Sequence, residues 1–160
     1  MKKILKELLL LSVSVFILTN IISYLRQPEL TNDRLPQSTL TLLDGARYRF
    51  EPTHPVIIHF WATWCRVCKM EASNIDRISK QYDVITIAIN SGADSDLQAY
   101  MKKYDLHFKV YNDSNGEWAK RFNIKVFPTT FIYDAKGKLR FTEVGYTSTV
   151  GLIARMKLVE

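Results

Sequence analysis

Cysteine is scarce in this sequence: the 160 residues include two, Cys65 and Cys68, and no internal repeat or low-complexity tract is apparent. Two cysteines three positions apart cannot build a scaffold of several disulfides, so hydrophobic packing must hold the fold together. The composition allows this, because 47% of the residues are hydrophobic, which is enough to bury a core. The length therefore fits one globular domain with a short appendage.

A broad excess of positive charge is also missing. The formal net charge is +6, but the basic residues are unevenly distributed. The first 26 residues contain Lys2, Lys3, Lys6 and Arg26 against the single acidic residue Glu7. The rest of the chain holds eighteen basic and fifteen acidic side chains, so only half of the excess lies there. This distribution predicts no nucleic-acid binding, which would need a basic patch on the folded domain.

One long hydrophobic stretch lies near the N-terminus. Residues 8–25 contain no charged side chain and, at about 1.5 Å per helical residue, roughly match the hydrocarbon core of a bilayer. Lysines precede it, so the positive-inside rule predicts residues 1–7 in the cytoplasm, a membrane-spanning signal anchor at residues 8–25, and the rest outside. A cleaved signal peptide is the alternative. The bulky residues 20–24 offer no small-x-small cleavage site, which favours an uncleaved anchor.

A polar segment separates this anchor from the predicted domain. Residues 26–37 include Pro28 and Pro36, and we expect them to form a linker that lifts the domain off the membrane. The domain itself is expected to comprise residues 38–160.

Hydrophobic patterning within residues 38–160 alternates between strands and helices. The nearly unbroken apolar run at residues 56–61 is typical of a strand covered on both faces. Further strands are expected at residues 39–43, 47–50, 84–89, 108–111, 129–133 and 139–144, and helices at residues 65–80, 94–104, 117–122 and 147–158. The pattern predicts an α/β protein with a mixed central sheet flanked by helices.

The two cysteines lie between the apolar run and the first helix of the domain. If Cys65 opens that helix, its sulfur lies beside unpaired backbone amides and the positive end of the helix dipole, which favour the thiolate. Cys68 follows after about one helical turn, so the two sulfurs can face each other. This arrangement predicts a dithiol–disulfide centre. Half of a zinc site is the alternative, but it would need two more ligands from His54, His59, His107 or carboxylates.

Two segments of the sequence resemble the thioredoxins. They are Trp61-Ala62-Thr63-Trp64-Cys65-x-x-Cys68 and Phe127-Pro128-Thr129-Thr130-Phe131, the second preceding a hairpin with a Lys-Gly-Lys turn. With the apolar anchor and Glu71, the chain looks most similar to the membrane-anchored TlpA-like thioredoxins, relatives of the cytochrome c maturation reductases and the copper-sensitivity-suppressor proteins. The resemblance covers about residues 35–158. It implies a thioredoxin fold and a protein thiol–disulfide oxidoreductase.

The resemblance also implies roles for the residues of these motifs. Cys65 is the expected nucleophile, which forms a mixed disulfide with a protein substrate, and Cys68 is the resolving thiol that releases the product. Pro128 matches the family's cis-proline, which lies against the cysteines and offers backbone groups to a substrate. Phe127 and Trp64 are expected to shape the substrate surface.

Two further residues are candidates for moving protons. Glu71 is the one charged member of a helical stripe formed by residues 68, 71, 75, 78 and 82. Its carboxyl is expected to be partly desolvated, with a raised pKa, and placed to take the proton of Cys68. A Glu71 that reaches solvent at the helix edge is the alternative. His59 stands where thioredoxin has a buried Asp, so it is either a proton relay or a hydrogen-bonded core histidine.

The direction of electron flow is the property that these residues leave most open. Arg66 and Val67 replace the Gly-Pro of thioredoxin, and the charge of Arg66 would stabilise the Cys65 thiolate and make the pair more oxidising, unless water screens it. The resemblance favours a reductant. A disulfide-donating oxidant is one alternative. A non-enzymatic copper-binding assembly factor is another, with His107 as its only distal candidate ligand.

Sequence and resemblance together define the expected setting of the protein. No dissociable cofactor and no metal is required beyond the redox-active Cys65–Cys68 pair. Because the periplasm is oxidising, a reductant there needs electrons from a membrane thiol-electron transporter. We therefore expect a single-pass protein of the bacterial inner membrane, whose thioredoxin-like domain lies on the periplasmic side and reacts with protein substrates.

Overall fold

The computed structural model describes residues 2–30 and 32–160. Met1, in the predicted cytoplasmic segment, and Thr31, in the predicted linker, lie outside the described residues. The helices are α1 (Lys2–Leu25), α2 (Arg66–Ser79), α3 (Asp94–Lys103), α4 (Glu117–Arg121) and α5 (Thr149–Lys157). The strands are β1 (Thr39–Thr41), β2 (Arg47–Arg49), β3 (Val56–Trp61), β4 (Asp83–Ile89), β5 (Lys109–Asp113), β6 (Thr129–Tyr133) and β7 (Leu139–Val144).

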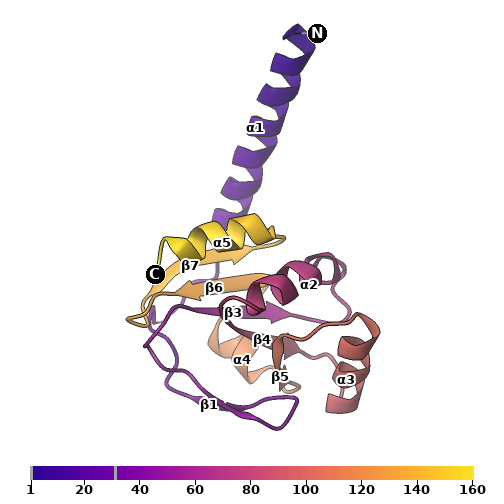
Figure 1. Cartoon of the computed structure of the whole chain (residues 1–160), viewed down its shortest axis with the longest axis vertical. Helices are drawn as coiled ribbons and strands as arrows, with labels where there is room; N and C mark the ends of the chain where they lie inside the picture. Colours follow the sequence, from indigo (N-terminus) through magenta and orange to yellow (C-terminus); the bar gives the residue numbers. More distant parts are fainter. Residues whose placement is uncertain (1, 31) are drawn as a thin grey trace.

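Five of the strands form a mixed sheet in the order β5-β4-β3-β6-β7. β3 is parallel to β4 and antiparallel to β6, and β6 and β7 form an antiparallel hairpin. β1 and β2 form a separate two-stranded sheet. Helices cover both faces of the large sheet (Figure 1). The prediction of an α/β protein with a mixed, helix-flanked sheet is therefore confirmed.

β3 lies between two hydrophobic cores, one on each face of the sheet. All six of its residues are buried, as expected for a strand covered on both faces. Because side chains alternate along a strand, Ile57 and Trp61 face the core beneath α2 and α5, which also contains Cys68 and Leu152. Phe60 faces the second core, beneath α4 and the β1–β2 hairpin. The cysteine pair thus lies on the α2–α5 side.

Many predicted element boundaries differ from the observed ones by one or two residues, and at the start of α2 and the end of β5 the difference involves a side chain that hydrogen-bonds to the N-terminus of a helix. α2 begins at Arg66, since Cys65 is the residue that caps the helix. β5 continues to Asp113, two residues beyond its predicted end. The buried Asp113 carboxylate accepts hydrogen bonds from the N–H groups of Trp118 (3.1 Å) and Ala119 (2.9 Å) at the start of α4. Asp113, a residue type that is common in turns, therefore ends β5, and its carboxylate satisfies backbone amides at the start of α4.

The segment after α1 lies along β7 and does not extend away from the domain. β7 is an edge strand, so one row of its backbone groups lacks a strand partner. Gln27 Nε2 donates to the carbonyl of Thr142 (2.6 Å), and the amide of Leu139 donates to the carbonyl of Asp33 (2.7 Å). Leu35 is buried. Since the segment satisfies the edge of the sheet, it does not lift the domain away from α1 as a free linker would.

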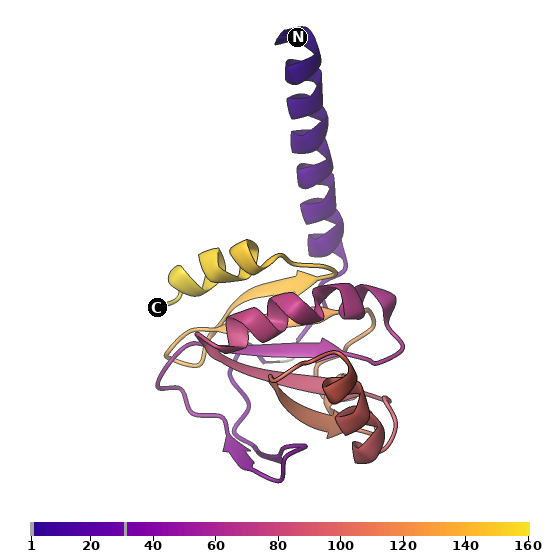
Figure 2. The same ribbon diagram turned by 45° about the vertical axis from the view of Figure 1, so that its right-hand side comes forward.

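α1 projects from one side of the domain and meets it near the C-terminal end of the helix (Figures 1 and 2). There the amide of Val144 in β7 donates to Ser23 Oγ at 3.0 Å. Within the described residues, Lys3–Leu25 is the one helix long and apolar enough to cross a membrane by length and composition. A signal sequence near the N-terminus passes the same criteria.

Candidate active site

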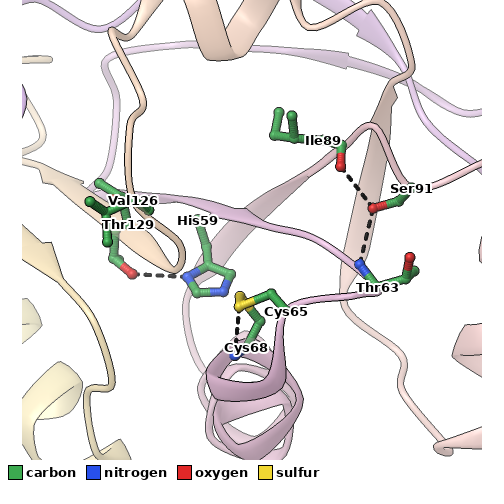
Figure 3. The surroundings of a disulfide bond; sticks show 9 residues. His59, Thr63, Cys65, Cys68, Ile89, Ser91, Val126 and Thr129 are labelled. Atoms are coloured by element: carbon green, nitrogen blue, oxygen red, sulfur yellow. Dashed lines mark hydrogen bonds between the residues drawn. A yellow bond between two sulfur atoms is a disulfide. The ribbon is translucent and has the colours of Figure 1, made fainter.

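The two cysteines form a disulfide where β3 passes into α2 (Figure 3). Cys65 caps the helix, and its Sγ accepts a hydrogen bond from the Cys68 amide at 3.1 Å. Both residues are buried, but Cys65 is 9% exposed against 2% for Cys68. After reduction, the same amide and the helix dipole favour a thiolate on Cys65. Cys65 is therefore the more accessible of the two cysteines, and Cys68 is the more shielded one.

The loop before Cys65 is held by the end of the neighbouring strand β4. The Thr63 amide donates to Ser91 Oγ at 3.0 Å, and Ser91 Oγ donates to the carbonyl of Ile89 at 2.9 Å (Figure 3). Trp64 Nε1 donates to the carbonyl of Asn90 at 3.2 Å. Sequence analysis did not identify Asn90 or Ser91 as site residues. The parallel pairing of β3 and β4 could have indicated these two residues, because it brings the ends of both strands to the same edge of the sheet.

Exposed or half-buried apolar side chains lie beside Cys65 in the sequence, along α2 and on the loops that contact Trp64 and α2. Trp64 is 63% exposed, and its ring contacts the half-buried ring of Phe127 edge-on, with centroids 5.5 Å apart. Asn74 on α2 donates to Tyr146 Oη at 3.0 Å, which places another exposed aromatic ring against this helix. The exchange surface, as we call it, comprises Trp64, Val67, Met70, Phe127 and Tyr146. Val67, Met70 and Tyr146 were not predicted, although the first two lie on the exposed side of an amphipathic helix.

Pro128 links this surface to the end of β7. The Phe127–Pro128 peptide bond is cis, as the sequence motif predicts. Pro128 is buried, and its carbonyl accepts a hydrogen bond from the Gly145 amide at 2.8 Å. Gly145 has a φ of 94°, a left-handed conformation that favours glycine at the bend after β7. The bend leads directly into Tyr146. The hydrogen bond between Gly145 and Pro128 therefore joins the segment that carries Phe127 to the segment that carries Tyr146.

Glu71 is completely buried in α2, one turn beyond Cys68. Its Oε1 accepts a hydrogen bond from the Thr147 amide at 2.9 Å, whereas Oε2 has no hydrogen-bond partner within the described structure. Burial raises the pKa of this carboxyl to about 8, the Thr147 hydrogen bond opposes the rise, and the negative charge of Glu143 adds to it. The solvent-exposed alternative for Glu71 is therefore wrong, because the side chain points into the domain.

Glu143 was not recognised in the sequence as part of the site. It lies on β7 opposite Thr130 of β6, and its Oε1 accepts a hydrogen bond from Arg155 Nε of α5 at 2.6 Å. Only the pairing of β6 with β7 and the packing of α5 bring this ion pair near Glu71. The proton affinity of Glu71 thus depends on residues more than seventy positions away in the sequence.

His59 is buried in β3, on the same face as Ile57 and Trp61. Its Nδ1 and Thr130 Oγ1 are 2.9 Å apart and form a hydrogen bond across β3 and β6. Burial lowers the pKa of His59 to about 3, so the ring is neutral at physiological pH. Figure 3 shows the ring turned toward the disulfide. His59 is thus a hydrogen-bonded core histidine in a position facing the cysteine pair.

In the described structure, neither Arg66 nor His107 makes a hydrogen bond to the sulfurs of Cys65 and Cys68. Arg66 is exposed on the first turn of α2, where water and salt screen its charge. His107 lies with its Nδ1 3.6 Å from Asp76, eight residues or about 12 Å along α2 from Cys68. Among residues 2–30 and 32–160, no group of three or more His, Cys, Asp or Glu side chains is placed to hold a metal ion. The distal histidine of the copper alternative is therefore not at the cysteine pair.

Comparisons with known proteins agree with this geometry. Residues 31–142 match the AhpC/TSA family. A thioredoxin-like protein of Haemophilus influenzae is 34% identical over 99% of this chain and 96% of its own length. The thiol–disulfide oxidoreductase ResA of Bacillus thuringiensis is 30% identical over 65% of this chain and 64% of its own. The exposed lipoprotein thioredoxin of Streptococcus pneumoniae superposes with a TM-score of 0.69 and 25% identity, covering 77% of this chain and 99% of that one. The predicted thioredoxin fold is therefore confirmed.

Proposed function

The chain belongs to the AhpC/TSA family and is a thiol–disulfide oxidoreductase, and we propose that it is a membrane-tethered reductant of protein disulfides outside the cytoplasm. The observation that carries the proposal is the Cys65–Cys68 disulfide at the start of α2, framed by an exposed apolar surface. We expect protein substrates there because an extended polypeptide chain can lie across such an open surface, whereas a small molecule would need an enclosed cavity.

In the proposed reaction, the Cys65 thiolate attacks a substrate disulfide. A bond forms between Cys65 and one substrate sulfur, the substrate S–S bond breaks, and the leaving sulfur takes up a proton. The Glu71 carboxylate then accepts the proton of Cys68, and the Cys68 thiolate attacks Cys65 Sγ. The bond between Cys65 and the substrate breaks, and the second substrate sulfur leaves as a thiolate that takes a proton from water, which releases the reduced substrate. The products are the Cys65–Cys68 disulfide and a protonated Glu71. A pKa of about 8 for Glu71 in the disulfide form supports this last step, since the carboxyl retains the proton at neutral pH.

Repeated turnover requires a source of electrons on the same side of the membrane. Because the bacterial periplasm is kept oxidising, the source we propose is a membrane thiol-electron transporter that reduces the Cys65–Cys68 disulfide. The exposed position of Arg66 supports the reductant direction, because a screened charge stabilises the Cys65 thiolate only weakly. Beyond the redox-active cysteines, the proposed cycle uses no cofactor.

We further propose that α1 is an uncleaved anchor in the inner membrane. Residues 1–7 would remain in the cytoplasm, residues 8–25 would span the bilayer, residues 26–37 would follow β7, and residues 38–160 would form the periplasmic domain. Support comes from the apolar helix Lys3–Leu25, the lysines at its start and the extracytoplasmic setting that the name of the pneumococcal relative states.

Substrate trapping tests the proposed reaction. The full-length Cys68→Ala variant is expected to accumulate mixed disulfides on Cys65, because no resolving thiol remains to release the substrate. Membranes are separated under non-reducing conditions and the linked proteins identified. The matched control is Cys65→Ala, which should trap little because Cys68 is 2% exposed. Absence of any disulfide-linked partner in cells where the wild type is active would contradict the mechanism.

The reduction potential decides between reductant and oxidant. A reductant is expected near the potential of thioredoxin, about −270 mV, whereas a strong periplasmic oxidant lies near about −120 mV. Equilibration of the purified protein with glutathione buffers, followed by its tryptophan fluorescence, gives the value. A potential close to that of the oxidants would reject the reductant proposal and leave the exchange chemistry intact.

A further inference from the structure

A row of polar side chains crosses the central strands of the large sheet at the level of His59. Strand pairing places Thr86 of β4 on one side of His59 and Thr130 of β6 on the other. All three side chains are buried. Their neighbours along each strand, such as Ile57 and Ile132, belong to the core that contains the two cysteines. The row therefore lies on the disulfide side of the sheet.

The two hydroxyl groups of this row have different partners. Thr86 Oγ1 donates to the carbonyl of Lys109 at 2.9 Å, so its proton is used toward β5 and away from His59. Thr130 Oγ1 lies 2.9 Å from His59 Nδ1 and has no other hydrogen-bond partner within residues 2–30 and 32–160. The direction of the bond between Thr130 and His59 therefore decides which ring nitrogen carries the proton.

The burial of Thr130 selects one direction for this bond. If Nδ1–H donated to Thr130 Oγ1, the hydroxyl proton of a completely buried side chain would have no acceptor. A buried donor without an acceptor carries its full desolvation penalty, and such donors are rarer than acceptors with a spare lone pair. A proton on Nε2 avoids this cost, because Nε2 is not among the completely buried polar atoms that lack a partner. The Thr130 hydroxyl therefore donates to Nδ1.

The Nε2 edge of the ring faces the cysteine pair. In Figure 3, Nδ1 points away from the disulfide along the dashed line, and Nε2 lies on the side nearer the sulfurs. Sulfur without charge is a weak acceptor, whereas a thiolate is a charged acceptor, and hydrogen bonds to charged groups are about twice as strong. A hydrogen bond from Nε2–H therefore favours the reduced pair.

We propose that Thr130 holds His59 as the Nε2–H tautomer and that this N–H group donates a hydrogen bond to the thiolate of the reduced cysteine pair. The role of this hydrogen bond in catalysis rests on the proposed exchange cycle. Burial lowers the pKa of His59 to about 3, so the ring stays neutral and its Nδ1 takes up no further proton. His59 is then a fixed donor and not a proton relay. The proton of Cys68 is left to the Glu71 carboxylate.

The other titratable groups around the cysteine pair come from α2, β7 and α5. Glu71 lies on α2 in the core, and Glu143 of β7, paired with Arg155 of α5, adds negative charge near it. Arg66 and Lys69 on α2 are exposed to water, which screens their charges. Burial and these carboxyl groups oppose a thiolate, and a neutral donor from the sheet offsets part of that effect.

Nitrogen NMR of the imidazole ring reads the tautomer directly. With His54→Gln and His107→Gln, His59 is the one histidine of the full chain, which is studied in detergent micelles. Correlation of the ring nitrogens with the ring protons should place the proton on Nε2 between about pH 5 and 8 in both the oxidised and the reduced protein. A proton on Nδ1 overturns the inference. This measurement needs no change at His59 or Thr130.

Titration of the reduced protein tests the effect on the sulfurs. In His59→Leu the ratio of thiolate to thiol, followed by ultraviolet absorbance, should fall about tenfold at a given pH, because a hydrogen bond to a charged group is lost. His59→Gln keeps an N–H donor at the position of Nε2 and should hold the ratio close to that of the wild type. Thr130→Val should lower the ratio by a smaller factor, because the ring loses the donor that orients it.

Thr86→Val is the matched control. It removes a buried hydroxyl from the same row, but one that donates to the Lys109 carbonyl, so the thiolate ratio should not change. Equal ratios in the wild type and His59→Leu would overturn the inference. Equal changes in Thr130→Val and Thr86→Val would overturn the part of Thr130. Both measurements use the resting protein without substrate, so their outcome is independent of substrate trapping by Cys68→Ala.

Discussion

Glu71 is the residue whose chemistry depends most on its surroundings. Removal from water destabilises its carboxylate, and the negative charge of Glu143 adds to this effect, whereas the Thr147 amide stabilises the charged form. The balance leaves Glu71 protonated at neutral pH in the disulfide state. In the proposed cycle, a protonated carboxyl one turn from Cys68 would donate a proton to the Cys68 thiolate when the disulfide is reduced.

Replacing Glu71 by Gln should expose this role in the pH dependence of the reaction. In the wild type, the rate of reduction of the Cys65–Cys68 disulfide by a small dithiol, divided by the fraction of the dithiol present as thiolate, should fall as pH rises through about 8, because Glu71 then loses the proton that it donates in the proposed cycle. In Glu71→Gln the rate below pH 8 should fall by about a hundredfold. The step near pH 8 should also disappear. Stopped-flow tryptophan fluorescence across a pH series measures both effects.

A conservative change at an exposed acid serves as the control for Glu71. Glu117→Gln, on the first turn of α4, makes the same chemical replacement without touching the site, and its profile should match the wild type. If Glu71→Gln also retained the wild-type rate and the step near pH 8, Glu71 would have no part in proton transfer.

At the scale of elements, the end of β4 holds the loop that presents Cys65. Ser91 is buried and accepts the hydrogen bond of the Thr63 amide, while its own hydroxyl donates to the carbonyl of Ile89. Parallel pairing of β3 and β4 is what brings the two loops together. The position of Cys65 therefore depends on the end of β4 as well as on the start of α2, although the cysteine motif lies only at the start of α2.

Ser91→Ala should lower the free energy of unfolding by about 1–3 kcal/mol, because the partly buried Thr63 amide loses its acceptor. Urea unfolding of the oxidised protein measures the change. Ser95→Ala on exposed α3 makes the same chemical change away from the loop and should alter stability much less. Equal losses in the two variants would show that the Ser91 hydrogen bond does not hold the loop.

At the scale of the whole molecule, the relation between anchor and domain decides where exchange takes place. The segment after α1 returns along β7, and the Ser23–Val144 hydrogen bond joins the helix directly to the sheet. A free linker would allow the exchange surface to sample all directions. With α1 as the proposed anchor, this arrangement would instead hold the β7 side of the domain toward the membrane.

If α1 is the proposed anchor, the basic residues in its first two turns should determine which side of the membrane the domain occupies. Replacing Lys2, Lys3 and Lys6 together by Asn removes the positive charge that keeps the N-terminus inside, so a fraction of molecules should insert with the domain in the cytoplasm. A reporter fused after Glu160, active on only one side of the membrane, measures the orientation. Replacing Lys136 and Lys138 in the β6–β7 turn by Asn should not change it. Unaltered orientation in the first variant would contradict a topology set by these lysines.

The sequence by itself determined the features that depend on local pattern. The apolar run of β3, the cysteine spacing at the start of α2 and the helical stripe that contains Glu71 all follow from residues close together in the chain. The cis conformation of the Phe127–Pro128 bond, by contrast, was expected from the resemblance of its motif to the thioredoxins. Local periodicity and motif composition are sufficient for such features, because neighbouring residues produce them.

Only the tertiary structure decided what surrounds these features. The approach of Glu143 to Glu71, the support of Thr63 by Ser91 and the return of the linker along β7 each join segments far apart in the sequence. They depend on strand register and on which edge of the sheet lacks a partner. No single stretch of residues encodes either property, because both arise from the packing of the whole domain.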